Sequence, residues 1–356
     1  ASGLQKGEDK TMIAFWTAAG HFVNPVSRFT QCLSYSNDKG RTWDKYQGNP
    51  IIGHIEGRNR DPKVRWHSEA KHWVMALFLG DQHYAFFKSD NLIDWKMTGK
   101  IKMPANECPD IFQLPLDNDE QNKKWIFWGG NGKYVIGDFD GEHFTIEGEA
   151  QQTHYGNRYY AAMSFNNAPE GRIIQIGWLV HMQSYKNANY VGQLSVPNEL
   201  KLQTNASGVP VLYANPVPEI KTLRKQKQIL NNISITEKPF EPPFSSELSD
   251  IFLETDMTEA SEFIAEVRGV PVVYNKEKEQ LNVAGTRVPM KLHNNRLSLR
   301  ILVDRLSVEV FGNGGEKAVF ITKKMNPQEL NYAFRTDGGR AEIKKLEMYA
   351  LESAWE

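Results

Sequence analysis

The chain has 356 residues, a hydrophobic content of 40% and a formal net charge of −1 at pH 7. This length is sufficient for two domains. The near-zero net charge gives no electrostatic reason to expect nucleic acid or an anionic membrane surface as a partner.

The predicted elements in the first 200 residues are short strands separated by turns, with almost no helical periodicity. The clearest apolar runs are Trp73–Leu79, Trp125–Trp128 and Ile173–Trp178. Dipeptides that favour turns, such as Asn131-Gly132 and Asp140-Gly141, lie between such runs. The pattern predicts an all-β protein.

One turn motif recurs along this region. Ser36–Trp43 reads SNDKGRTW, and we expect Asp38 to accept hydrogen bonds from turn amides and Gly40 to adopt a positive φ. Weaker versions are Ser89–Trp95 and Gly137–Phe144, so the closing aromatic residues are separated by roughly 50 residues. A four-stranded unit that repeats at about this length is typical of a β-propeller blade.

Polar clusters recur at nearly the same interval. Asp61, Glu107 and the pair His154-Tyr155 follow one another at this spacing. Residues at one phase of successive blades project toward the central channel of a propeller. We therefore expect these side chains to face a common axial pocket.

The two acids suit glycoside cleavage, which commonly uses one protonated carboxylic acid and a second carboxylate. Glu107 lies in the stretch NECPD beside Asp110, directly before an apolar strand, and Asp61 lies between Arg60 and Pro62. The proline should hold Asp61 in an extended conformation. The residues alone leave alternatives open, in which Glu107 caps a turn and Asp61 forms a surface ion pair with Arg60.

The rest of the sequence offers few other reaction chemistries. Its two cysteines, Cys32 and Cys108, cannot form a disulfide framework, and Cys108 reads as a packing residue. No ligand spacing typical of a metal site, no cofactor motif and no apolar run of about 18 residues is present in the sequence.

The propeller-like pattern ends after about residue 200. A proline cluster at 239–243 suggests a connector, and cleaner alternation follows, as in SVEVF at 307–311. This alternation is typical of a β-sandwich. We predict a propeller domain over 1–220, a linker over 221–244 and a sandwich over 245–356.

Taken together, five motifs resemble glycoside hydrolase family 32, the β-fructosidases that include levanases, inulinases and invertases. They are YSNDKGRTW at 35–43, RDPKV at 60–64, ECPD at 107–110, GDFDG at 137–141 and SVEVFGNGG at 307–315. The resemblance covers nearly the whole chain. It implies a five-bladed β-propeller followed by a β-sandwich, and hydrolysis of fructosides with retention of configuration.

Carried over motif by motif, the resemblance implies that Glu107 is the general acid/base and that Asp61 stabilises the transition state, with Arg60 close by. It also implies a substrate pocket without metal or cofactor, partly lined by Tyr155, Tyr160, Trp178 and His154, although His154 stands where the family often has an acid. The family further favours an extracytoplasmic location.

One departure concerns the nucleophile. The family carries it in a Trp-Met-Asn-Asp-Pro-Asn-Gly motif in the first blade, and the 356 residues contain no such motif. We therefore expect the first blade to be absent or incomplete and the chain by itself to be crippled as an enzyme. The alternatives are a non-catalytic fructan-binding propeller protein and a five-bladed relative that acts on arabinosides or another furanoside.

Overall fold

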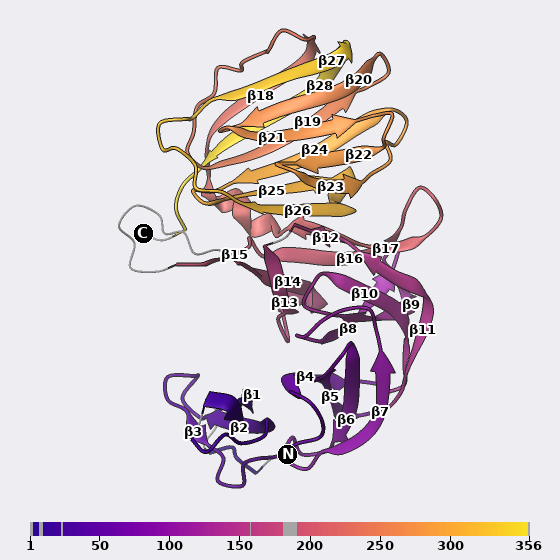
Figure 1. Ribbon diagram of the computed structural model, residues 1–356, viewed down its shortest axis with the longest axis vertical. Helices are drawn as coiled ribbons and strands as arrows, with labels where there is room; N and C mark the ends of the chain where they lie inside the picture. Colours follow the sequence, from indigo (N-terminus) through magenta and orange to yellow (C-terminus); the bar gives the residue numbers. More distant parts are fainter. Residues whose placement is uncertain (1–2, 7–9, 23, 157, 181–190, 355–356) are drawn as a thin grey trace. The chain divides into compact units, whose positions relative to one another are not determined.

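The computed structural model describes residues 3–6, 10–22, 24–156, 158–180 and 191–354. The prediction of an all-β protein is confirmed, since the helical elements among these residues are short 3-10 turns (Figure 1). The chain forms two compact units. The first unit consists of Ala1–Gln152 and Ala161–Asn166, and the second of Thr153–Tyr160 and Asn167–Glu356.

The first unit consists of antiparallel strands in which sequence neighbours pair with each other. A three-stranded sheet comes first, and two four-stranded meanders follow it. The elements are β1 (Met12–Ala18), η1 (Gly20–Phe22), β2 (Thr30–Ser36), β3 (Asp44–Lys45), β4 (Arg60–His67), β5 (His72–Gly80), β6 (His83–Ser89), β7 (Lys96–Lys102), β8 (Asp110–Leu116), β9 (Asp119–Trp128), β10 (Lys133–Phe139) and β11 (Phe144–Gln152).

Strand β5 shows how the meanders pack. Successive side chains of a strand point to opposite faces of its sheet. Val74, Ala76 and Phe78 accordingly join one apolar cluster with residues of β8, β9 and β10. Met75 and Leu77 join a second cluster on the opposite face. Because both faces are covered, six consecutive residues of β5 are buried, which explains its continuous apolar sequence.

The turn motif at 36–43 folds as predicted. Asp38 accepts hydrogen bonds from the backbone N–H and the hydroxyl of Thr42, at 2.9 and 2.6 Å. Gly40 has φ +84°, a conformation that glycine adopts without steric cost. The indole N–H of Trp43 donates to the Gly40 carbonyl at 3.0 Å and closes the turn.

The second unit contains further strands and a β-sandwich. The elements before the sandwich are β12 (His154–Tyr155), β13 (Tyr159–Ser164, which crosses the boundary between the units), η2 (Pro169–Gly171), β14 (Ile173–Leu179), β15 (Gln193–Leu194), β16 (Asn198–Thr204), β17 (Pro210–Pro216) and η3 (Pro218–Leu223). Those that follow are β18 (Arg224–Ile235), β19 (Ser249–Asp256), β20 (Ala260–Val267), β21 (Val270–Asn275), β22 (Gln280–Val283), β23 (Thr286–Pro289), β24 (Arg296–Val303), β25 (Ser307–Gly312), η4 (Asn313–Gly315), β26 (Lys317–Thr322), β27 (Tyr332–Gly339) and β28 (Ala341–Leu351).

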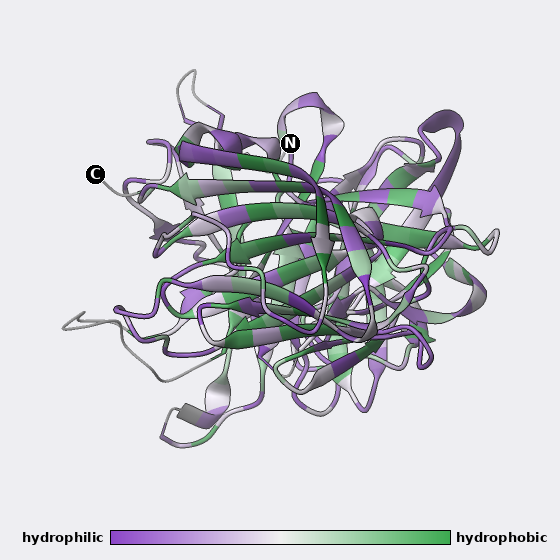
Figure 2. Cartoon of the chain, turned by 90° about the horizontal axis from the view of Figure 1, so that it is seen from above, coloured by the Kyte–Doolittle hydropathy of each residue, from purple (hydrophilic) through white to green (hydrophobic). Residues whose placement is uncertain are grey.

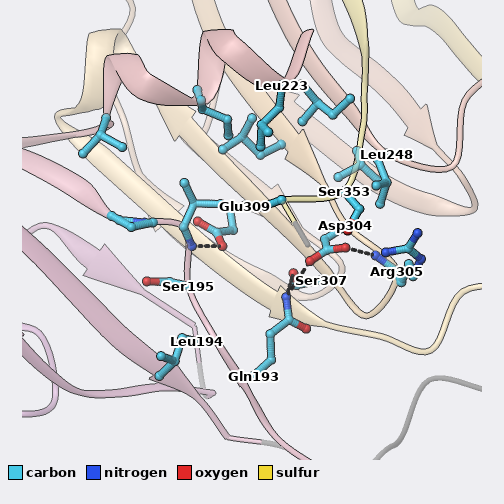
Figure 3. A pocket seen from close by; sticks show the side chains of 18 of the residues that line it. Gln193, Leu194, Ser195, Leu223, Leu248, Asp304, Arg305, Ser307, Glu309 and Ser353 are labelled. Atoms are coloured by element: carbon cyan, nitrogen blue, oxygen red, sulfur yellow. Dashed lines mark hydrogen bonds between the residues drawn. The ribbon is translucent and has the colours of Figure 1, made fainter. Parts of the chain in front are cut away.

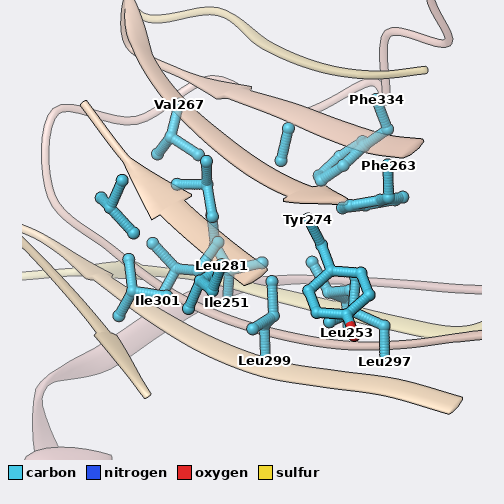
Figure 4. Close-up of a cluster of buried hydrophobic side chains, with 14 of the residues drawn as sticks. Ile251, Leu253, Phe263, Val267, Tyr274, Leu281, Leu297, Leu299, Ile301 and Phe334 are labelled. Atoms are coloured by element: carbon cyan, nitrogen blue, oxygen red, sulfur yellow. The ribbon is translucent and has the colours of Figure 1, made fainter. Parts of the chain in front are cut away.

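The sandwich pairs a seven-stranded sheet, ordered β12-β26-β25-β24-β19-β28-β18, with a five-stranded sheet, ordered β23-β22-β21-β20-β27. Its core lies between them, where Ile251 and Leu253 of β19 meet Phe263 of β20 and Tyr274 of β21 (Figure 4). Hydrophobic and hydrophilic segments alternate along the strands (Figure 2), as expected for sheets with one covered face.

The predicted linker over 221–244 is corrected by the structure. Residues 224–235 form β18, which pairs with β28 from Arg224↔Leu351 to Ile235↔Ala341. This strand lies at the edge of its sheet and is mostly exposed, so its composition is polar and its alternation is weak. Together with the proline cluster that follows, the polar composition concealed a strand of the sandwich.

Candidate active site

The RDP motif forms a β-bulge at the start of β4. The pairing of β4 with β5 jumps from Arg60↔Phe78 to Lys63↔Ala76, so that Asp61 and Pro62 together oppose one residue. Proline has no N–H to contribute to a sheet, and a bulge changes the direction of the adjacent side chains.

The prediction that Asp61 is extended is wrong. Its φ is +63°, in the left-handed region, because the bulge imposes a local geometry that overrides the preference of a residue before proline. Glu107 and Cys108, in the loop that leads into β8, also have positive φ values of 51° and 40°. Such conformations cost about 1–3 kcal/mol each and cluster at functional sites.

Arg60 joins the two predicted catalytic acids. Its Nη2 donates a hydrogen bond to Oε1 of Glu107, and its Nε lies 3.7 Å from Oδ2 of Asp61. The guanidinium is held from two other sides, by the Arg58 carbonyl at 2.8 Å and by the Phe78 ring at 4.8 Å. The planar fork of an arginine suits this bridge between two carboxylates.

Asp61 is fixed by contacts from two segments distant in sequence. The Cys108 N–H donates to Asp61 Oδ2 at 3.1 Å, and the Asp61 N–H donates to Thr17 Oγ1 at 3.1 Å. Burial raises the pKa of Asp61, and the nearby Glu107 adds to that effect, whereas the Cys108 N–H and Arg60 act in the opposite direction. The site therefore holds a partly desolvated carboxyl group between donors that favour its ionised form.

Cys108 contributes its backbone rather than a reactive thiol. Burial raises the pKa of the thiol, as do the neighbouring charges of Asp61 and Glu107. A thiol that resists ionisation is a poor nucleophile. This agrees with the reading of Cys108 as a packing residue.

The second acid of ECPD points into the core. Asp110 is fully buried, and its Oδ1 lies 3.3 Å from Nζ of Lys63. Its carboxylate also accepts hydrogen bonds from the N–H groups of Ile111 and Ser164, at 2.9 and 2.5 Å. The acid that shares a cation with Glu107 is therefore Asp61.

The remaining predicted site residues belong to the second unit or its boundary strand. The His154 side chain is 2% exposed, and its ring stacks on Tyr159 with the centroids 4.7 Å apart. Burial lowers the pKa of His154 to about 3, so the ring is neutral. Tyr155 and Tyr160 are partly buried, and Trp178 is 45% exposed. That Tyr155, Tyr160 and Trp178 contact the substrate stays a prediction, whereas the buried ring of His154 leaves no surface for a sugar.

A separate cavity of about 1020 Å³ lies within the second unit (Figure 3). Its lining includes Leu194, Leu223, Leu248 and Glu309, and none of the predicted site residues. One oxygen of Glu309 accepts the Val196 N–H at 2.9 Å, and the other has no hydrogen-bond partner among the described residues. Burial raises the pKa of Glu309 to about 8.

Two features bear on metals and membranes. In the described part of the chain, no group of three or more His, Cys, Asp or Glu side chains is placed to hold a metal ion. Across the same residues, we find no helix with the length and apolar character needed to cross a membrane.

Sequence reasoning missed the residues that support the acids. Thr17 donates to the buried Gln31 at 2.8 Å, and Gln31 Nε2 donates to the Asn59 carbonyl at 2.9 Å, directly before the bulge. For Thr17, the available signal was a polar residue at the end of an apolar strand, in the stretch FWTAAG. Lys63 gave no comparable signal, because its strand reads RDPKVRWH and most of its residues are polar.

Comparison with known proteins places these motifs in context. The model of the glycosyl hydrolases family 32 N-terminal domain matches residues 2–216, and the model of the family 32 C-terminal domain matches residues 219–350. A levanase of Bacillus subtilis (strain 168) is 32% identical over 407 aligned residues that cover 99% of this chain and 59% of that protein. A levanase of Bacillus sp. (strain L7) is 28% identical, covering 91% of this chain and 41% of that protein.

The fold is likewise similar to a solved structure. The crystal structure of exo-inulinase from Aspergillus awamori superposes with a TM-score of 0.86 at 23% identity, covering 99% of this chain and 82% of that one. The chain thus spans 59% and 41% of the lengths of the two levanases.

Proposed function

The chain belongs to glycosyl hydrolase family 32, and we propose that it acts as a retaining β-fructosidase that releases fructose from levan, inulin or sucrose-type fructosides. The observation that carries the proposal is the bridge that Arg60 forms between Asp61 and Glu107. The sequence similarity to levanases and to an exo-inulinase supports the substrate class. A relative named as an extracellular exo-inulinase, from Aspergillus awamori, is 26% identical to this chain and supports an extracytoplasmic location.

Each charged residue has a role in this proposal. Glu107 protonates the glycosidic oxygen as the bond to the anomeric carbon of fructose breaks, and a carboxylate nucleophile attacks that carbon. Glu107 then removes a proton from water, which displaces the nucleophile and completes fructose with retained configuration. Asp61 stabilises the charge that develops on the sugar by bonding its hydroxyls, and Arg60 orients both acids.

Further residues are proposed to contact the sugar. Tyr155, Tyr160 and Trp178 carry the aromatic and hydroxyl groups that sugars commonly bind. His154 is left out of this set because its ring is covered by Tyr159.

The nucleophile is not among the 356 residues, since they contain no Asn-Asp-Pro-Asn-Gly segment. We propose that this segment is supplied by the first blade of a five-bladed propeller. Because each 1.36 kcal/mol of barrier changes the rate tenfold, loss of a covalent nucleophile should nearly abolish turnover. The same observation favours a second candidate function, a fructan-binding protein without catalysis.

Fructose release from levan, inulin and sucrose distinguishes the two functions. The chain is assayed alone and after fusion behind a family segment that carries the nucleophile motif, each with its Glu107→Gln counterpart. An enzyme gives release in the fused protein that falls by about 10²–10⁴-fold in Glu107→Gln. Equal rates in both fused proteins exclude Glu107 as the acid, and fructan binding without any release supports the second candidate.

A further inference from the structure

Lys63 and Asp110 form a buried ion pair. They are close in sequence to Asp61 and Glu107 but are not part of the bridge that Arg60 makes between those acids. Lys63 follows Asp61 by two residues in β4, and Asp110 follows Glu107 by three residues at the start of β8. Even a fully extended chain would span at most about 7 Å over two residues and about 11 Å over three, so the ion pair is close to the acids along both segments. It joins the two segments that carry them.

The surroundings of the ion pair are closed to water. The Lys63 and Asp110 side chains are 7% and 0% exposed, and Nζ to Oδ1 is 3.3 Å. Lys63 Nζ also donates to the Ser164 carbonyl at 2.5 Å, and Arg65 donates to the Ser164 hydroxyl at 2.9 Å. Burial lowers the pKa of Lys63, which Asp110 opposes.

Such an arrangement is costly if its only purpose is stability. Taking two charges out of water carries a desolvation penalty that their attraction often fails to recover, and apolar replacements are frequently as stable. What a buried pair does supply is a fixed geometry. The two strands cannot slide past one another without separating Lys63 from Asp110.

We propose that Lys63 and Asp110 are positioning residues that set the placement of Asp61 relative to Glu107 and Cys108. They act through β4 and β8 and do not touch substrate. Only the catalytic role of the two acids rests on the proposed function. The placement of Asp61 relative to Glu107 and Cys108 can be tested without any activity.

The Cys108 N–H reports this placement directly because it donates to Asp61 Oδ2 at 3.1 Å. The chain has two cysteines, so labelling with ¹⁵N-cysteine gives two backbone amide signals. Cys32, buried in β2, is the internal reference. On titration with acid, the chemical shift of the Cys108 amide should change as Asp61, whose neighbours are Arg60 and Glu107, takes up its proton.

The variants are Asp110→Asn, Lys63→Met and Lys63→Arg. We expect Asp110→Asn and Lys63→Met to reduce the pH-dependent shift of the Cys108 signal at least twofold, with Cys32 unchanged. Lys63→Arg keeps the charge and should give a smaller change of the same kind. It also serves as the test if the other variants do not fold.

The matched control is Asp250→Asn in the second unit. Asp250 is also fully buried, and its Oδ2 lies 2.6 Å from Nη2 of Arg224. This control should leave the Cys108 titration as in the unaltered chain. An equal loss in Asp250→Asn, or an unaltered Cys108 titration in the folded Lys63 and Asp110 variants, overturns the inference.

Activity provides a separate readout. In the fused protein with the nucleophile motif, displacement of the acids should lower kcat about 10²-fold while KM changes less than about threefold. A fused protein that releases no fructose, while Cys108 responds as expected, refutes the proposed function and leaves the positioning inference standing.

Discussion

Replacement of Asp61 by asparagine should stabilise the fold while it removes activity. Asparagine keeps an oxygen for the Cys108 N–H and tolerates the left-handed φ of +63°. It loses the 3.7 Å ion pair with Arg60, which is worth at most about 1 kcal/mol because both side chains are partly exposed. Against this, it removes the cost of burying the charge, which is the first cause of the raised pKa of Asp61.

The sign of the stability change follows from the linkage between protonation and folding. A carboxyl group whose folded pKa is raised stabilises the fold below its unfolded pKa, and this contribution is lost as the pH rises through the folded value. At pH 7 the charged aspartate therefore disfavours folding, and Asp61→Asn should gain about 1 kcal/mol, or roughly 2–4 °C in Tm. At pH 3 the difference should vanish, because Asp61 is protonated in both states.

Thermal unfolding at pH 7 and pH 3 measures this effect, and fructose release by the fused protein should fall about 10²–10³-fold. Asp38→Asn is the control of opposite sign, because hydrogen bonds from Thr42 hold the pKa of Asp38 well below its usual range. It should lower Tm at pH 7. A lower Tm for Asp61→Asn at pH 7, or the same difference at both pH values, would show that burial of the Asp61 charge does not destabilise the fold.

Other substitutions test the remaining parts of the structure. Arg60→Lys should reduce kcat/KM of the fused protein about 10–100-fold, because an ammonium cannot bridge two carboxylates as the guanidinium does, whereas Arg58→Lys should have no effect, since Arg58 supplies only its carbonyl. Burial keeps Glu309 protonated in the folded state up to about pH 8, so the free energy of unfolding of the native chain in urea should fall as the pH rises from 4.5 to about 8. Glu309→Gln should remove this fall. Leu253→Ala should cost about 2–5 kcal/mol in the sandwich core, whereas the exposed Leu194→Ala should change unfolding by less than about 0.5 kcal/mol.

Much of what could be predicted about the fold and the site came from the repeat in the sequence. Its turn residues Asp38 and Gly40 fold as expected. The interval between Asp61 and Glu107 predicted that the two acids share a site, and in the structure both lie beside Arg60. Such features are local or periodic, so they can be read from one sequence. His154 kept the interval, yet its ring packs among aromatic side chains of the second unit, which spacing alone does not distinguish from an axial position.

Other features depend on partners that are distant in the chain. The bulge at Asp61 arises from pairing with β5, and it overrides a rule based on the next residue alone. The ion pair of Lys63 with Asp110 joins two strands whose contact no local pattern reveals. Strand β18 owes its place to β28, which lies more than a hundred residues later.

Whether Asp61, Arg60 and Glu107 form a fructose site can be determined from a crystal of the chain soaked with fructose. We expect one fructose whose hydroxyl groups lie within hydrogen-bond distance of Asp61 and Arg60, with its anomeric oxygen near Glu107. Fructose bound elsewhere, with the three side chains free of sugar at saturating concentration, would contradict this expectation.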